Sequence, residues 1–289
     1  MYPNLMTGTA RCGLPLVVVA ILLSACGSQM SKGGLAESGA RTNTVLDCDM
    51  CDLRYEHFHD QNLTGSSFKG AFLFGSDFAR SNLRNADFES ANLVLSNFER
   101  ADLSGADLSK ANLTRATMLG ATMRDAVLVF GILDEAYLEG VDISDSLMTA
   151  ASMKAVNLYR AIGKRTILRN ADLRKAQMQR VNLQAALLQG AKLTGADMSS
   201  ADLTSADLTN ADLRGAKLSG VNLSYARLTG ANFTGADLSG SIIFGTNMKS
   251  INLTDADMTG AKYASAITTG ANFCRTKMPD GSVGKCTAK

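Results

Sequence analysis

The sequence predicts an all-β fold of one kind, a single-domain β-helix of about 11 four-sided coils. Three observations predict it. Large apolar residues recur at every fifth position from Leu53 to Phe273, small residues stand two positions before each of them, and a weaker pattern recurs at every fourth pentapeptide. Together they indicate which residues point inward, how the chain winds and how many sides each coil has.

The five-residue period separates inward from outward positions. Of the 45 positions at this spacing, 43 hold Leu, Phe, Met, Ile or Tyr, and the exceptions are Gly163 and Thr268. Two residues earlier, 42 of 45 positions hold Ala, Ser, Thr, Val, Gly or Cys, with Glu56, Gln61 and Ile251 departing. A period of five fits neither a strand nor an amphipathic helix. One unit cannot bury its two apolar side chains alone, so the units must wind and stack.

Longer periods indicate four sides per coil. In the first repeats phenylalanine alternates with leucine, which places Phe58, Phe68, Phe78, Phe88 and Phe98 at every second pentapeptide. Opposite charges stand four pentapeptides apart in Asp134–Lys154 and Asp145–Arg165. With four pentapeptides per coil, the first, third and fifth of these phenylalanines should stack in one interior column, and the other two in the opposite column.

The first 25 residues read as a signal peptide. A single charge, Arg11, precedes the apolar run from Leu14 to Leu23, which is too short for a membrane span of about 20 residues. The following Leu-Ser-Ala-Cys string resembles a bacterial lipobox, which predicts lipidation of Cys26. An ordinary secretory signal with a chance cysteine is the alternative. Residues 26–47 then form the lipidated N-terminus and a flexible tether, and Gly27 favours an outer-membrane lipoprotein that faces the periplasm of a Gram-negative cell.

Strings such as ADLSGADL at Ala101–Leu108 and ADLTSADL at Ala201–Leu208 resemble the pentapeptide repeat family. The resemblance covers roughly residues 48–286. It implies a right-handed quadrilateral β-helix with a packed, dry interior, here over residues 48–275, followed by a C-terminal capping tail at 276–289. The five-residue count supports the coil independently, whereas the handedness comes only from the resemblance.

Four further cysteines are predicted to close the two ends of the rod as disulfides. A rod of about 50 Å separates Cys48 and Cys51 from Cys274 and Cys286, far beyond the reach of a disulfide. We therefore expect Cys48–Cys51 and Cys274–Cys286 in the oxidising periplasm.

Metal binding is a weaker interpretation of the N-terminal end. Two histidines, His57 and His59, follow Cys48 and Cys51 closely, and two Cys with two His suit Zn²⁺. The spacing fits no standard zinc finger, and the two histidines should diverge because they flank an inward phenylalanine. We expect no metal and no cofactor.

Catalysis is not predicted, because neither a nucleophile–base pair nor a phosphate-binding loop is visible. Stacked carboxylates, Asp87 with Asp107 and Asp237 with Asp257, leave a cell-wall enzyme as one alternative. Some members of the family mimic DNA and shield DNA gyrase. The predicted export and the net charge of +2 disfavour this second alternative and any nucleic-acid partner.

An interaction surface is predicted in the middle of the rod. Outward apolar residues recur at every fourth pentapeptide, at Val127, Leu147, Ile167 and Leu187. Basic residues follow nearby, among them Arg160, Arg165, Arg169 and Arg180. Aligned apolar groups are typical of a contact surface, although a face covered by a tail and a solvated basic face are the plainer interpretations. The sequence therefore favours a non-enzymatic, lipid-anchored scaffold whose partner is an envelope protein, an anionic polymer or a second copy.

Overall fold

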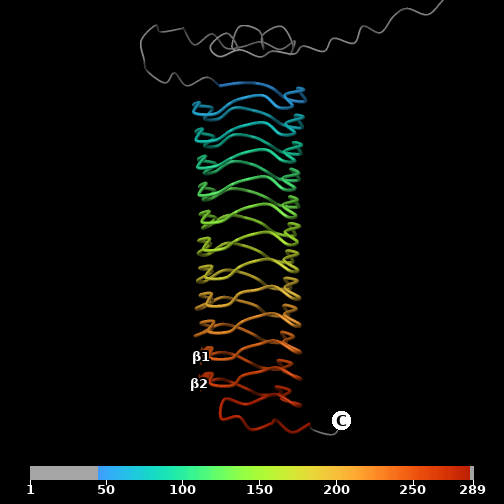
Figure 1. Cartoon of the computed structure of the whole chain (residues 1–289), viewed down its shortest axis with the longest axis vertical. Coiled ribbons are helices and arrows are strands. Elements are labelled where there is room, and N and C mark those ends of the chain that lie inside the picture. Colours follow the sequence, from blue (N-terminus) through green and yellow to red (C-terminus); the bar gives the residue numbers. More distant parts are fainter. Residues whose placement is uncertain (1–44, 287–289) are drawn as a thin grey trace, which may run out of the picture.

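The computed structural model describes residues 45–286, in which the chain winds into one long four-sided coil (Figure 1). Every parallel bridge joins a residue to its counterpart four pentapeptides later, from Asp47–Ser67 to Asp257–Lys277. The predicted coil of four pentapeptides is therefore confirmed. Two bridges extend into short strands, β1 (Ile242–Phe244) and β2 (Lys262–Ala264), which pair in parallel near the C-terminal end.

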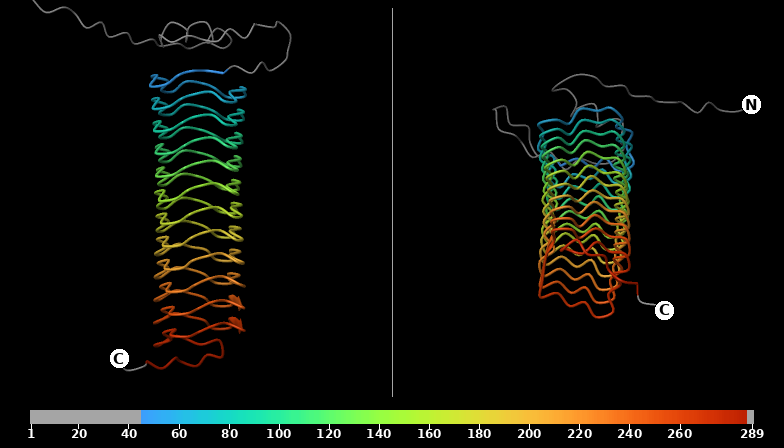
Figure 2. Two further views of the ribbon diagram at one scale, coloured as in Figure 1. Left: turned by 180° about the vertical axis from the view of Figure 1, so that it is seen from behind. Right: turned by 60° about the horizontal axis from the view of Figure 1, so that its bottom comes forward.

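The four sides of the rod carry one pentapeptide each and enclose the interior (Figure 2). We name them by one coil: face A is residues 121–125, face B is 126–130, face C is 131–135 and face D is 136–140. Each face recurs at every fourth pentapeptide in both directions, and the fifth residue of each pentapeptide lies at a corner.

Backbone and side-chain hydrogen bonds explain the pentapeptide pattern, and residues 102–106 are representative. The N–H groups of Leu103 and Gly105 donate to carbonyls of the next coil, at 2.7 and 2.8 Å. The N–H of Ala106 donates to the Leu103 carbonyl at 3.0 Å and closes a turn whose third residue, Gly105, has a φ of 70°. This is a type II turn. The Asp102 carboxylate accepts the N–H of Ser104 at 3.0 Å, so an acceptor is favoured at the second position.

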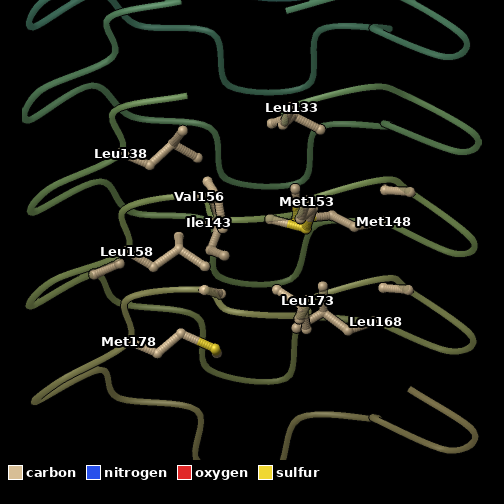
Figure 3. Close-up of a cluster of buried hydrophobic side chains, with 14 of the residues drawn as sticks. Leu133, Leu138, Ile143, Met148, Met153, Val156, Leu158, Leu168, Leu173 and Met178 are labelled. Atoms are coloured by element: carbon tan, nitrogen blue, oxygen red, sulfur yellow. The ribbon is translucent and has the colours of Figure 1, made fainter. Parts of the chain in front are cut away.

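The interior is a continuous stack of the inward side chains. Phe58, Phe78 and Phe98 stack with ring centroids 4.8 and 5.0 Å apart, and Phe68 stacks on Phe88 at 5.0 Å in a second column. The predicted phenylalanine columns are thus confirmed. Figure 3 shows the same packing in mid-rod, where the four faces of one coil each bury a side chain, namely Ile143, Met148, Met153 and Leu158.

The C-terminal end closes with a hairpin and a disulfide. Lys277 pairs antiparallel with Val283, and the N–H of Gly284 donates to the Thr276 carbonyl at 2.8 Å. The predicted disulfide Cys274–Cys286 is confirmed.

At the N-terminal end, the prediction of a Cys48–Cys51 disulfide is wrong. Cys48 is a free, buried thiol, whereas Cys51 is disulfide-bonded, though not to Cys48. The cause lies in the coil, because Cys48 fills the large inward position of face B and Cys51 the small inward position of face C.

The predicted signal peptide and the lipidation site Cys26 lie outside the described residues. Within residues 45–286, no helix has the length and apolar character to cross a bilayer.

Candidate interaction surfaces

The four outward apolar residues predicted in mid-rod do form one column on face B. Val127, Leu147, Ile167 and Leu187 are bridged successively, and each is half-buried by its neighbours. We call these four residues the apolar column. The same register continues into Asp107 on one side and Asp207 on the other, so carboxylates bound the column at both ends.

The apolar column lacks a hydrogen bond that most second positions of the rod make. At most second positions an Asn or Asp side chain accepts the N–H two residues later, as Asp207 does for Thr209 at 3.0 Å. In the described chain no side chain accepts the corresponding N–H of Val129, Thr149, Arg169 or Gln189. A typical hydrogen bond contributes about 1 kcal/mol to stability. Each of these four consecutive coils therefore lacks the acceptor residue that its turn favours.

Apolar character extends sideways from the column. Val129 and Ala150 are half-buried beside it, and the corner residue Phe130 is 60% exposed. Phe130 also has a φ of 58°, a conformation that bulky residues seldom adopt. Face B therefore carries a largely uncharged surface over residues 126–130 and 146–150.

Only one of the four predicted basic residues lies on face B with the column. Arg169 lies on face B and donates to Gln189 at 3.1 Å, and Arg165 lies at the corner between faces A and B. Arg160 and Arg180 lie at the corner between faces D and A, so all of face A separates them from the column. Sequence proximity was misleading here, because each pentapeptide carries the chain to the next face.

The two predicted ion pairs between coils are confirmed. Lys154 lies 3.2 Å from Asp134, and Arg165 lies 2.6 Å from Asp145. The hydrogen bonds from Arg165 hold the pKa of the Asp145 carboxyl below its usual value. Arg165 is therefore engaged in the rod itself.

The N-terminal histidines and cysteines do not converge. His57 and His59 are exposed with ring centroids 6.3 Å apart, His59 lies 3.1 Å from Asp60, and Cys48 is buried. No group of three His, Cys, Asp or Glu in residues 45–286 is arranged to hold a metal ion.

The stacked carboxylates that suggested an enzyme are engaged in their own turns. Asp87 and Asp107 are bridged, as are Asp237 and Asp257. Each accepts the backbone N–H two residues later, at 2.8 to 3.0 Å. The repeat itself therefore explains these carboxylates.

A second apolar surface, which was not predicted from the sequence, lies on face C near the N-terminal end. Tyr55, Phe72 and Leu95 are 65%, 48% and 50% exposed, and Tyr55 meets Phe74 edge to face at 5.4 Å. The signal was present, because Phe72, Phe74 and Leu95 stand at outward positions of the five-residue pattern.

Comparison with known proteins returns repeat proteins of the same type. A family model described as pentapeptide repeats matches eight copies within residues 81–260. HetL, a pentapeptide repeat protein involved in heterocyst differentiation regulation in the cyanobacterium Nostoc sp. strain PCC 7120, is 31% identical. That match covers 81% of this chain and 93% of HetL, with a TM-score of 0.47. No curated protein matches the chain.

Two further solved structures share less of the chain. QnrB1, a plasmid-mediated fluoroquinolone resistance protein, is 20% identical, with 59% of this chain and 88% of QnrB1 covered and a TM-score of 0.32. A pentapeptide repeat protein of the Arabidopsis thaliana thylakoid lumen is 29% identical, with 37% and 68% covered and a TM-score of 0.27.

Proposed function

Because the chain belongs to the pentapeptide repeat family, we propose that it is a non-enzymatic interaction module of the bacterial cell envelope. In this proposal the coil is right-handed, lipid at Cys26 anchors it to the outer membrane, and face B contacts a partner protein. The partner presents a flat, uncharged and apolar surface.

The apolar column carries the proposal. Most second positions of the rod keep an Asn or Asp acceptor that stabilises the neighbouring turn, as Asp107 and Asp207 do at the column's ends. Four successive apolar residues forgo that acceptor and keep part of their surface exposed. Aligned groups of this kind are typical of sites where another protein excludes water.

Anchoring would place the column away from the bilayer. The predicted tether, residues 26–47, would have an r.m.s. reach of roughly 25 Å. Leu147 lies about five coils from Val45, which adds about 25 Å along the rod. A rod of this kind would hold face B within the periplasm, where envelope proteins can reach it.

Photo-crosslinking in intact cells tests the proposal. A probe at residue 147 should give a discrete adduct to another protein, identified by mass spectrometry. The matched control is a probe at Asn247, which occupies the same position on the same face. An adduct only to a second copy of this chain would show that face B forms a homo-oligomer and does not bind a different protein. Equal labelling from the probes at residues 147 and 247 would contradict the proposal.

Substitutions that suit the fold separate structure from binding. Leu147→Asn and Ile167→Asn restore an acceptor for the N–H of Thr149 and Arg169, so the melting temperature should hold or rise. The same changes should abolish the adduct, now probed from Val129. Retention of the adduct in the double variant would exclude the column as the contact.

A further inference from the structure

Uncompensated positive charge gathers in one part of the rod. Lys and Arg side chains elsewhere mostly face a carboxylate, as Arg80 faces Asp60 at 2.6 Å and Arg275 faces Asp255 at 2.6 Å. Between residues 160 and 192, within the described chain, the cations other than the paired Arg165 and Arg174 have no carboxylate within ion-pair distance: Arg160, Lys164, Arg169, Lys175, Arg180 and Lys192. Three others, Lys249, Lys262 and Lys285, are scattered towards the C-terminus.

Three of the six lie at the edges of face D. Arg160 and Arg180 occupy successive coils at the corner between faces D and A, and Lys175 lies at the opposite edge of face D. Their neighbours along the rod axis at the corners are uncharged, namely Gly140, Ser200, Ala155 and Gly195. Lys164, Arg169 and Lys192 lie on other faces, and Lys192 is bridged between Asp172 and Asp212.

Arg160 and Arg180 form a like-charge stack without a counterion. Equivalent residues of successive coils lie about one strand spacing apart, roughly 4.8 Å, and like charges in that position repel. Arg80 and Arg100 stack at the same corner, but Asp60 and Glu99 accompany them. The Arg160 guanidinium lies 5.0 Å over the Tyr159 ring, which holds the charge at the corner.

Between these cations, residues 156–159 and 176–179 carry no charge, and Glu139 and Asp197 lie on the neighbouring coils of the same face. Tyr137, Asn157 and Gln177 are bridged successively along face D, and Tyr137 and Gln177 are exposed. Amide and phenol groups can both donate to and accept from hydroxyl groups, and an exposed aromatic ring can pack on a sugar ring. Inorganic polyphosphate offers acceptor oxygens alone, so it would leave the acceptors of Gln177 and the phenol unused, whereas the Asn157 Oδ1 already accepts the Tyr159 N–H at 3.0 Å.

We propose that face D, over residues 156–160 and 176–180 and with the cations Arg160, Lys175 and Arg180 at its edges, binds a carboxylate-bearing polysaccharide. The guanidinium groups pair with the carboxylates of the sugar acids, and Asn157 and Gln177 bind their hydroxyls. The ligand supplies the counterions that the Arg160–Arg180 stack lacks. This surface lies two faces from the apolar column and does not depend on it.

Calorimetric titration of the purified full chain at low salt tests the inference, with polygalacturonate as the probe. Arg160→Gln/Arg180→Gln should weaken binding by about tenfold or more. The control, Arg80→Gln/Arg100→Gln, removes the same charge at the same corner and should change affinity by less than about twofold. Arg160→Gln/Arg180→Gln should leave the melting temperature unchanged or raise it, because the repulsion between the two guanidinium groups is relieved. The control variant should lower the melting temperature, because two ion pairs are lost.

Other polymers and variants decide the ligand class. Neutral dextran should not bind, and Gln177→Ala should weaken polygalacturonate but not inorganic polyphosphate. Two outcomes would overturn the inference, because either would reduce the site to general polyelectrolyte attraction. One is an equal loss of polygalacturonate affinity in the two double arginine variants. The other is that polyphosphate binds as tightly per charge as polygalacturonate and that Gln177→Ala affects neither. Leu147→Asn should leave polygalacturonate binding unchanged, so failure here stays distinct from failure of the face B proposal.

Discussion

The ring of Tyr55 occupies the space directly beside Gly75 on the next coil. A Cβ added to Gly75 would lie 2.8 Å from Cδ1 of Tyr55. The same arrangement recurs at Tyr225 and Gly245, where the distance to Cδ1 is 2.9 Å. In both places the ring also meets a phenylalanine edge to face, which is Phe74 for Tyr55.

We expect Gly75→Ala to destabilise the N-terminal coils. The new Cβ would push the Tyr55 ring out of its contact with Phe74, and a φ of 67° at residue 75 strains any residue other than glycine. Gly65 provides the control, because its φ is 71° but a Cβ there would meet no atom within 4 Å. In urea unfolding, Gly75→Ala should cost about 1 kcal/mol more than Gly65→Ala. Tyr55→Ala should remove that excess, and its persistence would refute the steric cause.

The thiol of Cys48 should be inert in the folded protein. Burial raises its pKa to about 11, and the nearby carboxylates of Asp47 and Asp49 contribute to that rise. The thiolate is the reactive form, so iodoacetamide at about pH 8 should leave Cys48 unmodified until urea unfolds the chain. An exposed reference thiol, made by Ser205→Cys, should be alkylated at once. Equal rates at residues 48 and 205 would show that the first coil is open.

Loss of the C-terminal disulfide should loosen the cap and leave the rod intact. Cys274 and Cys286 close a loop with a sequence separation of 12, and such a crosslink is worth about 3 kcal/mol. In Cys286→Ser, amide exchange should accelerate at Arg275 and Gly284, whose N–H groups hold the hairpin. Exchange at Leu147, in mid-rod, should not change. Uniform acceleration along the chain would show instead that the cap governs the stability of every coil.

The interior of the rod could be predicted almost completely from the sequence. Two inward residues in every five leave few arrangements, and the 20-residue spacing of the outward apolar residues, such as Val127 and Leu147, predicted four pentapeptides per coil before any contact was known. The ion pair between Asp145 and Arg165 followed from the same spacing of four pentapeptides. These features depend only on the period, which the sequence displays without a break.

Features that depend on the direction of single side chains could not be predicted in this way. Cys48 and Cys51 stand close in the sequence, but both fill inward positions and lie on different faces. Arg160 and Arg165 are one pentapeptide apart, and that interval carries the chain across face A from one corner to the next. The five-residue period predicts the face on which a residue lies, but contacts between residues of different faces depend on the three-dimensional structure of the coil.

Acid should weaken the last coils through Asp257. Hydrogen bonds from the Thr259 hydroxyl, from Lys277 and from the Thr259 N–H lower the pKa of this carboxyl from 3.8 to about 2. A depressed pKa in the folded state means that the carboxylate stabilises the fold above about pH 4, and that this contribution is lost as the pH falls towards 2.

Asp257→Asn keeps an acceptor for the Thr259 N–H, 2.9 Å away in the native protein, but cannot titrate. Amide exchange at Thr259 should therefore accelerate more between pH 4 and pH 2 in the native protein than in Asp257→Asn. Lys277→Met, which removes a partner 2.9 Å from the carboxylate, should move the onset of acceleration to higher pH. An identical acid response in all three proteins would show that Asp257 does not contribute to the acid stability of this end.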